Sequence, residues 1–120
     1  MKKLIYVSHP SSGKIENTLK VEKIIKELYK HKELYENLTF VSPIHCYGFM
    51  YNDCDYDTGL SFCTDLLEHC SGMLLCGDWE KSTGCKVERQ ICLDKGIPIV
   101  EVFNSDDIEN KKALIINLGS

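Results

Sequence analysis

The chain has 120 residues, of which 43% are hydrophobic and 27% are charged. These values are typical of one globular domain and exclude a disordered or fibrous chain. The formal charge is −4, and the lysines are spread along the sequence except at 20–32, where they alternate with glutamate. A nucleic-acid surface needs clustered basic residues, so we expect no nucleic acid polymer as a partner.

The start of the chain and its cysteines predict a cytoplasmic protein. Two lysines precede a short apolar run, Leu4–Val7, which is too short for a secretory signal. No apolar stretch approaches the length of a membrane span, so no membrane partner is expected. Seven cysteines without a CxxC motif indicate reduced and mostly buried thiols. A disulfide framework is a weaker alternative, as is a zinc site built from His45, Cys46 and Cys54, whose spacing fits no common pattern.

Apolar runs bounded by turn residues predict five strands, at 3–8, 38–42, 72–77, 97–103 and 113–118. Amphipathic patterns predict helices at 14–36, 59–70, 83–95 and 105–111. Gly96 is expected to end the third of these helices. Residues 44–58 are rich in aromatic and acidic side chains without clear periodicity, which indicates a long loop that could serve as a lid.

Strands that alternate with helices indicate a parallel sheet covered by helices on both faces. We therefore expect a single flavodoxin-like (Rossmann-like) α/β domain over residues 1–120, with five strands in the order 2-1-3-4-5. In such sheets ligands bind at the carboxyl ends of the strands, near the switch point between strands 1 and 3. This rule selects two loops, Ser8–Lys14 and Asp78–Gly84.

Glu88 is the most informative single residue. Cys85, Ile91 and Cys92 define an inward-facing stripe on the helix predicted at 83–95, and Glu88 lies within that stripe. An ionisable group on an apolar face is costly to bury unless it is paired or functional. The two interpretations left open are a functional carboxylate and a glutamate that bonds a neighbouring loop backbone.

Asp65 and Asp78 are the other candidate acids. Asp78 directly follows a buried strand, at the edge of the sheet where ligands are expected. Asp65 lies off the apolar stripe of its helix, so a solvated surface carboxylate is the alternative for this residue.

Small polar residues at the two selected loops predict an anion site. Ser82, Thr83 and Gly84 resemble a helix N-terminus, where free N–H groups can bind phosphate and a hydroxyl can also simply cap the helix. The first loop would add donors from Ser8, Ser11, Ser12, Gly13 and Lys14. It contains neither GxxxxGK[ST] nor GxGxxG, so a nucleotide triphosphatase and a dinucleotide fingerprint are not supported.

Aromatic and histidine side chains flank these loops. Trp79, the only tryptophan, would either stack on a base or cover the edge of the sheet. Tyr6 stands near the end of the first strand. His9 and His45 fall in loops at the edges of the expected site, and for both we favour an ordinary surface histidine.

Three segments resemble the nucleoside 2-deoxyribosyltransferase superfamily, and in particular small bacterial and phage domains related to it and the deoxynucleoside 5′-monophosphate N-hydrolases. These segments are KLIYVSHPSSG, DLLEHCSGMLLCGDW and WEKSTGCKVERQICLDKGIPIV. Together they cover roughly half of the chain, and the last is the most specific.

The resemblance implies a role for each matching residue. Glu88 matches the nucleophile that attacks C1′ of a deoxyribose, and Asp65 matches an upstream acid that helps the base to leave. Ser82 falls where the monophosphate hydrolases carry a serine that touches phosphate, and Tyr6 matches a tyrosine near the site. Arg89 and Gln90 depart from the residues that usually follow the nucleophile.

We therefore expect an enzyme that cleaves the N-glycosidic bond of a nucleoside or deoxynucleoside 5′-monophosphate, by hydrolysis or by transfer, without metal or organic cofactor. A carboxylate beside C1′ and a second acid are the groups that this reaction needs. The alternatives are a non-catalytic nucleotide-binding module, an interaction protein with an empty site, and an NAD-cleaving glycohydrolase. A homodimer or higher homo-oligomer is expected by analogy with the superfamily.

Overall fold

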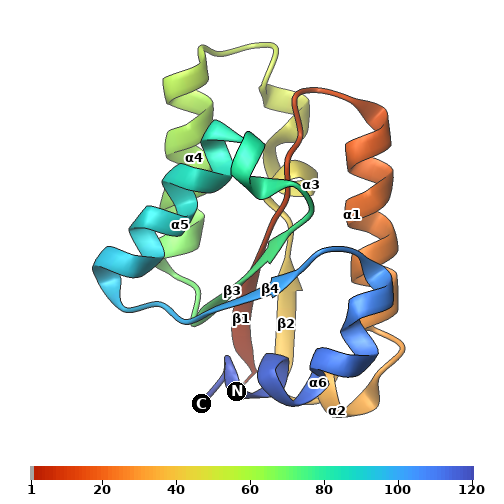
Figure 1. Cartoon of the computed structure of the whole chain (residues 1–120). Helices are drawn as coiled ribbons and strands as arrows, with labels where there is room; N and C mark the ends of the chain where they lie inside the picture. The colour runs from red at the N-terminus through yellow and green to blue at the C-terminus, as the bar shows by residue number, and fades with distance from the viewer. Residues whose placement is uncertain (1) are drawn as a thin grey trace.

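The computed structural model describes residues 2–120 as an α/β fold built on a parallel sheet (Figure 1). The sheet has four strands in the order β2-β1-β3-β4, and each neighbouring pair is parallel. The strands are β1 (Lys3–Ser8), β2 (Leu38–Val41), β3 (Gly72–Cys76) and β4 (Ile99–Val102). The α/β class and the parallel sheet are confirmed, and the predicted five-stranded order is wrong because the fifth strand is absent from residues 2–120.

Six α-helices and three short 3-10 helices connect and cover the strands. The α-helices are α1 (Ile15–Leu28), α2 (Lys32–Tyr35), α3 (Pro43–Tyr47), α4 (Tyr56–Glu68), α5 (Thr83–Lys95) and α6 (Ile108–Asn117). The 3-10 helices are η1 (Gly48–Met50), η2 (Trp79–Lys81) and η3 (Ser105–Asp107). Gly96 ends α5 in the left-handed conformation, with φ 71°, as predicted from the sequence.

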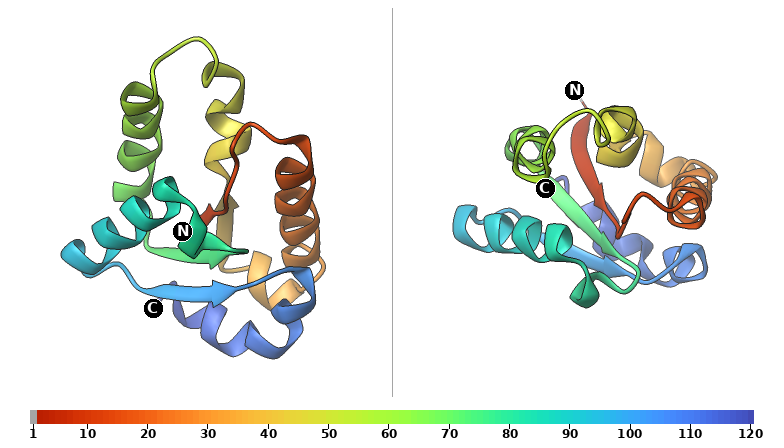
Figure 2. Two further views of the ribbon diagram at one scale, coloured as in Figure 1. Left: turned by 45° about the horizontal axis from the view of Figure 1, so that its top comes forward. Right: turned by 90° about the horizontal axis from the view of Figure 1, so that it is seen from above.

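The sheet lies between two groups of helices (Figures 1 and 2). Helices α1, α2 and α6 contribute to one apolar core, and helices α4 and α5 contribute to the other. Successive side chains of a strand point to opposite faces of a sheet. Ile5 and Val7 of β1 therefore join the first core, and Tyr6 joins the second. Ser8 follows the same alternation, so Tyr6 and Ser8 both face α5.

The segment predicted as a fifth strand, 113–118, is helical instead, and most of it belongs to α6. A short apolar run does not by itself distinguish a buried helix from a buried strand. The deciding feature is spacing: Ile108 and Ile115 are seven residues apart, lie on one side of a helix and are fully buried, whereas Leu114 is 56% exposed.

The helix predicted over 14–36 is divided in two. α1 ends at Leu28, and α2 starts again after His31, which has an extended backbone. Tyr29 stands at the break, where its hydroxyl accepts a hydrogen bond from the Phe40 backbone and its ring packs edge-on against the Phe40 ring. The turn therefore ties the end of α1 to β2.

The long loop predicted over 44–58 is also wrong, because this segment contains α3, η1 and the start of α4. Ser42 caps α3 by accepting a hydrogen bond from the His45 backbone, and Pro43 occupies its first turn. Asp55 caps α4 by accepting from the Thr58 backbone at 2.7 Å. Both caps are recognisable in the sequence as starts of helices. They indicate helical structure here more reliably than the lack of clear periodicity indicates a loop.

All seven cysteines are free, and five of them are buried: Cys63, Cys70, Cys76, Cys85 and Cys92. Within residues 2–120 no three His, Cys, Asp or Glu side chains are grouped in a way that would hold a metal ion. Over the same residues, none of the helices combines the length and apolar character that a membrane span requires.

Candidate functional site

Two neighbouring cavities lie at the carboxyl edge of the sheet, beside the loops that follow β1 and β3. The first has a volume of about 520 Å³ and extends between α4, α5 and the β1–α1 loop, with Glu88 in its wall. We call it the Glu88 cavity. The second has a volume of about 480 Å³ and extends between α1 and the loops after β3 and β4. Both volumes are in the range of small-molecule sites.

Glu88 is buried, with 6% of its surface exposed, and both of its carboxylate oxygens are engaged. The Tyr6 hydroxyl donates a hydrogen bond to Oε2. The Ser8 hydroxyl donates to Oε1 at 2.8 Å, and the Cys85 sulfur lies 3.4 Å from the same hydroxyl. The partners of Glu88 are thus side chains of β1 rather than the backbone of a loop. Each oxygen of an ionised carboxylate retains a further lone pair, which leaves Glu88 able to act on a bound ligand.

Burial raises the pKa of the Glu88 carboxyl, and the hydrogen bonds from Tyr6 and Ser8 partly offset that rise. Burial, together with the nearby charge of Glu88, raises the pKa of the Tyr6 phenol. Tyr6 therefore remains a hydrogen-bond donor across the physiological range. A carboxyl group with a raised pKa beside a cavity is typical of functional sites.

We expect the variant Glu88→Gln to be more stable than the wild type at high pH, by roughly 1 kcal/mol at pH 8. The pKa of Glu88 is higher in the folded protein than in the unfolded chain. The folded protein is therefore most stable below the unfolded pKa, where Glu88 is protonated in both states, and it loses stability as the pH rises through the folded pKa. Glutamine does not titrate. Urea denaturation at pH 4, 6 and 8 should therefore show a stability difference that grows with pH, and a difference that grows toward acid would contradict this account.

The start of α5 brings small polar groups to the Glu88 cavity. The Ser82 hydroxyl caps α5 by accepting from the Cys85 backbone at 3.2 Å, and Ser82 also borders the cavity. The capping role is therefore confirmed, and it leaves Ser82 in reach of a ligand. The other predicted loop residues in this wall are Ser11, Ser12, Gly13, Thr83 and Gly84.

Asp65 is not brought to this site. It is exposed on α4 and borders neither cavity. The α4 residues in the wall include Gly59, Leu60 and Cys63. Asp65 is two residues beyond Cys63, a rotation of about 200° around a helix, and so lies on the far side. The second carboxylate in the wall is instead Asp55, at the start of α4.

Asp78 and Trp79 follow β3, but neither borders the Glu88 cavity. Asp78 is exposed and borders the second cavity, on the α1 side of the sheet edge. Trp79 borders neither cavity: its ring nitrogen donates to Glu101 at 2.9 Å, and the Arg89 guanidinium lies 5.3 Å from its ring centre. Of the two interpretations given to Trp79, its position favours covering the edge of the sheet.

His9 was expected to be a surface histidine, and this is wrong: it is 8% exposed and borders both cavities. Its Nδ1 donates to the Pro10 carbonyl at 2.7 Å, which leaves Nε2 as the acceptor of the neutral ring. Burial lowers the pKa of His9; the Pro10 carbonyl opposes this, and the charge of Lys20 adds to it. His45 is exposed, as expected, and bonds Ser42 and Glu22.

Five residues from the segment predicted as a loop also line the Glu88 cavity: Ile44, Tyr51, Asn52, Asp55 and Tyr56. The Tyr51 hydroxyl lies 3.2 Å from the Cys63 sulfur. Burial raises the pKa of the Tyr51 phenol. The helix caps at Ser42 and Asp55 could have revealed these residues. They form part of the cavity wall, and the Tyr56 hydroxyl would lie 3.7 Å from a Cβ built on Gly84 of α5.

Gly77 holds the loop after β3 close to His9. It has φ 63°, and a Cβ built on it would lie 3.0 Å from His9 Nε2. We expect Gly77→Ala to lose about 1–2 kcal/mol from the left-handed backbone alone, and more because His9 must move. Gly96→Ala is the control, since Gly96 has φ 71° and open space around it. Equal losses in urea denaturation would show that the contact with His9 has no cost.

The family model described as "Domain of unknown function (DUF4406)" matches residues 3–101 of the chain. The match includes both selected loops, α5 and every strand except the last residue of β4. No curated protein and no solved structure matches the chain.

Proposed function

The chain belongs to the DUF4406 family, and we propose that this member cleaves the N-glycosidic bond of a nucleoside or deoxynucleoside 5′-monophosphate, with Glu88 as nucleophile. The observation that carries the proposal is a buried carboxylate, 6% exposed, in the wall of a cavity and held by donors on both oxygens. The resemblance of three segments to the nucleoside 2-deoxyribosyltransferase superfamily supports the choice of substrate.

The proposed reaction has two steps. Ionised Glu88 attacks C1′ while the bond from C1′ to the base nitrogen breaks, and the electron pair leaves with the base, which takes up a proton. Water then attacks the glycosyl ester, releases the sugar 5-phosphate and restores the carboxylate, and its proton balances the one taken by the base. In a transferase, a second base takes the place of water.

The small polar groups of the cavity fit the phosphate of this substrate. Ser82 stands at the N-terminus of α5, where free backbone N–H groups and the helix dipole favour an anion. Ser11, Ser12 and Gly13 border the same cavity from the opposite loop. A phosphate held between these two loops would leave the sugar near Glu88.

The position of Asp65 favours a second candidate function. A neutral purine or pyrimidine base leaves more easily when an acid protonates it, and the acid assigned to that role borders neither cavity. A pyridinium base such as nicotinamide leaves as a neutral molecule and needs no proton. An NAD-cleaving glycohydrolase therefore needs Glu88 but no second acid. A binding module that retains nucleotide without turnover fits the same observation.

The test is incubation of the purified protein with ribo- and deoxyribonucleoside 5′-monophosphates and with NAD, followed by chromatography of the products. Free purine or pyrimidine supports the first function, and free nicotinamide supports the second. Calorimetric binding of a nucleotide without product supports the binding module. No base release across the full panel by folded protein would contradict both enzymatic functions.

A further inference from the structure

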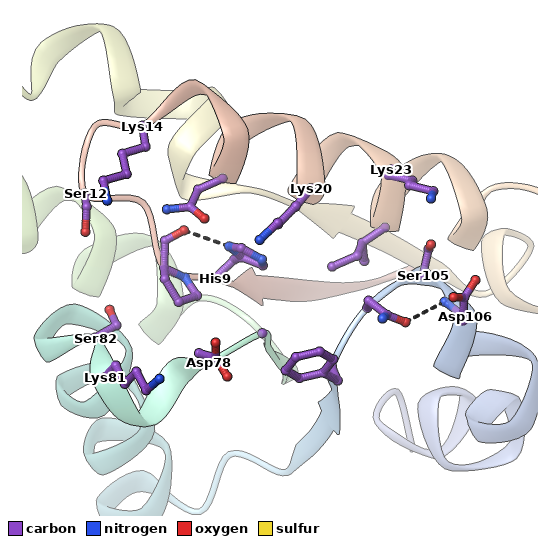
Figure 3. A pocket seen from close by; sticks show the side chains of 16 residues that line it. His9, Ser12, Lys14, Lys20, Lys23, Asp78, Lys81, Ser82, Ser105 and Asp106 are labelled. Carbon is purple, nitrogen blue, oxygen red and sulfur yellow. Dashed lines mark hydrogen bonds between the residues drawn. The ribbon is translucent and has the colours of Figure 1, made fainter.

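The second cavity is lined by four lysines, Lys14, Lys20, Lys23 and Lys81, and we call it the lysine cavity. Three of them come from α1 and the residue before it, and Lys81 comes from η2 (Figure 3). In Figure 3, Lys14, Lys20 and Lys23 lie on one side of the hollow and Lys81 on the other. Segments far apart in the sequence thus place lysines around one space, and the ammonium groups of Lys20 and Lys81 point toward it.

The lysine cavity is positive within a chain whose net charge is −4. Its wall contains four lysines and two aspartates, Asp78 and Asp106, an excess of two positive charges. His9 adds no charge at neutral pH, because its pKa is lowered. A hollow whose lining has a net charge of one sign attracts ligands of the opposite sign.

None of these four lysines takes part in an ion pair within residues 2–120. The ion pairs of lysine in that part of the chain use Lys30, Lys32, Lys95 and Lys112 instead. Like charges around one space without a partner repel one another, and an anion placed there would be attracted to each of them. Asn17 and Ser105 add neutral hydrogen-bonding groups to the same wall.

The lysine cavity is contiguous with the Glu88 cavity. Four residues border both: His9, Ser12, Lys81 and Ser82. A phosphate at Ser82 would therefore stand at the junction, and a further phosphate would extend toward the lysines. Phosphate groups are ligands that lysine binds readily through its compact charge.

We infer that the lysine cavity is an anion site that binds a diphosphate, either as a separate ligand or as an extension of the 5′-phosphate of a nucleotide in the Glu88 cavity. The joint use of the two cavities by one ligand rests on the proposed function. Anion binding by the lysine cavity does not, because it depends only on the charges and position of its own residues.

The test is calorimetric titration with inorganic pyrophosphate at low ionic strength. We expect the wild type to bind, and the double variant Lys20→Gln/Lys23→Gln to bind about tenfold more weakly, an effect that added salt reduces. The matched control is Lys26→Gln/Lys86→Gln, which removes the same charge from exposed positions on α1 and α5 outside both cavities. Circular dichroism verifies that each variant is folded.

The outcomes separate this inference from the proposed function. No pyrophosphate binding by folded wild type, or equal losses in the two double variants, would overturn the inference whatever the base-release assay gives. Pyrophosphate binding that is weakened by Lys20→Gln/Lys23→Gln but not by Lys26→Gln/Lys86→Gln would support the inference, even if no base is released. A deoxynucleoside diphosphate that binds more tightly than its monophosphate, with the difference lost in the first pair, would support joint use of the cavities.

Discussion

Base release is expected to fall by about 10³-fold or more in Glu88→Gln, because the amide cannot form the glycosyl ester. Glutamine has nearly the same shape, and the Tyr6 and Ser8 hydroxyls that bond the carboxylate can reorient to bond an amide. The loss therefore reports the missing nucleophile rather than a collapsed site. The measurement is the initial rate of base release, with urea denaturation confirming that the variant is folded.

Asp65→Asn is the matched control for this loss, since it also converts one carboxylate to an amide. Asp65 is exposed and borders neither cavity, so we expect its rate to remain within a few-fold of the wild type. A large loss in Asp65→Asn would show that the acid acts at a site that these cavities do not include. Full activity in Glu88→Gln would exclude Glu88 as nucleophile.

The burial of Glu88 was predictable from the helical period of its segment. The helical period puts Glu88 on the inward side of α5, between Cys85 and Cys92, and both cysteines are buried. The strand period of two places Tyr6 and Ser8 on the same face of β1. Neither period reveals that the two side chains bond Glu88, since that requires the parallel pairing of β1 with β3 and the packing of α5 against them.

Asp65 shows where a resemblance is less informative than geometry. Its distance along the chain from Glu88 matches that of the superfamily acid, but helical phase decides which side chains face the cavity. In this chain Cys63 and Leu60 face it instead. The position of Asp65 off the apolar stripe was already visible in the sequence, and the structure agrees with that observation.

The remaining differences between prediction and structure have two causes. Some sequence patterns are too short to identify an element, and some features depend on contacts between distant parts of the chain. The run at 113–118 is too brief to tell strand from helix. The burial of His9 results from the loop after β3, where Gly77 approaches its ring. The lysine cavity joins residues from three parts of the chain, Lys14–Lys23, Lys81 and Asp106, and no local pattern connects them.

Tyr6→Phe is expected to move the pH profile of base release to higher pH and to lower the rate at neutral pH by roughly 10–100-fold, since a hydrogen bond to a charged group contributes about 1.5–3 kcal/mol. The hydrogen bond from Tyr6 lowers the pKa of Glu88 and so opposes the effect of burial. Its removal raises that pKa. The nucleophile must be ionised, so activity then appears only at higher pH.

Tyr51→Phe is the control that separates this effect from simple loss of a hydroxyl. Tyr51 borders the same cavity, but its hydroxyl bonds Pro43 and contacts Cys63 rather than Glu88. The pH profile of base release by Tyr51→Phe should keep the wild-type midpoint even if the rate of this variant changes. If Tyr6→Phe and the wild type gave superimposable profiles, Tyr6 would only position Glu88. If both tyrosine variants shifted alike, the shift would reflect the polarity of the whole cavity and not one donor.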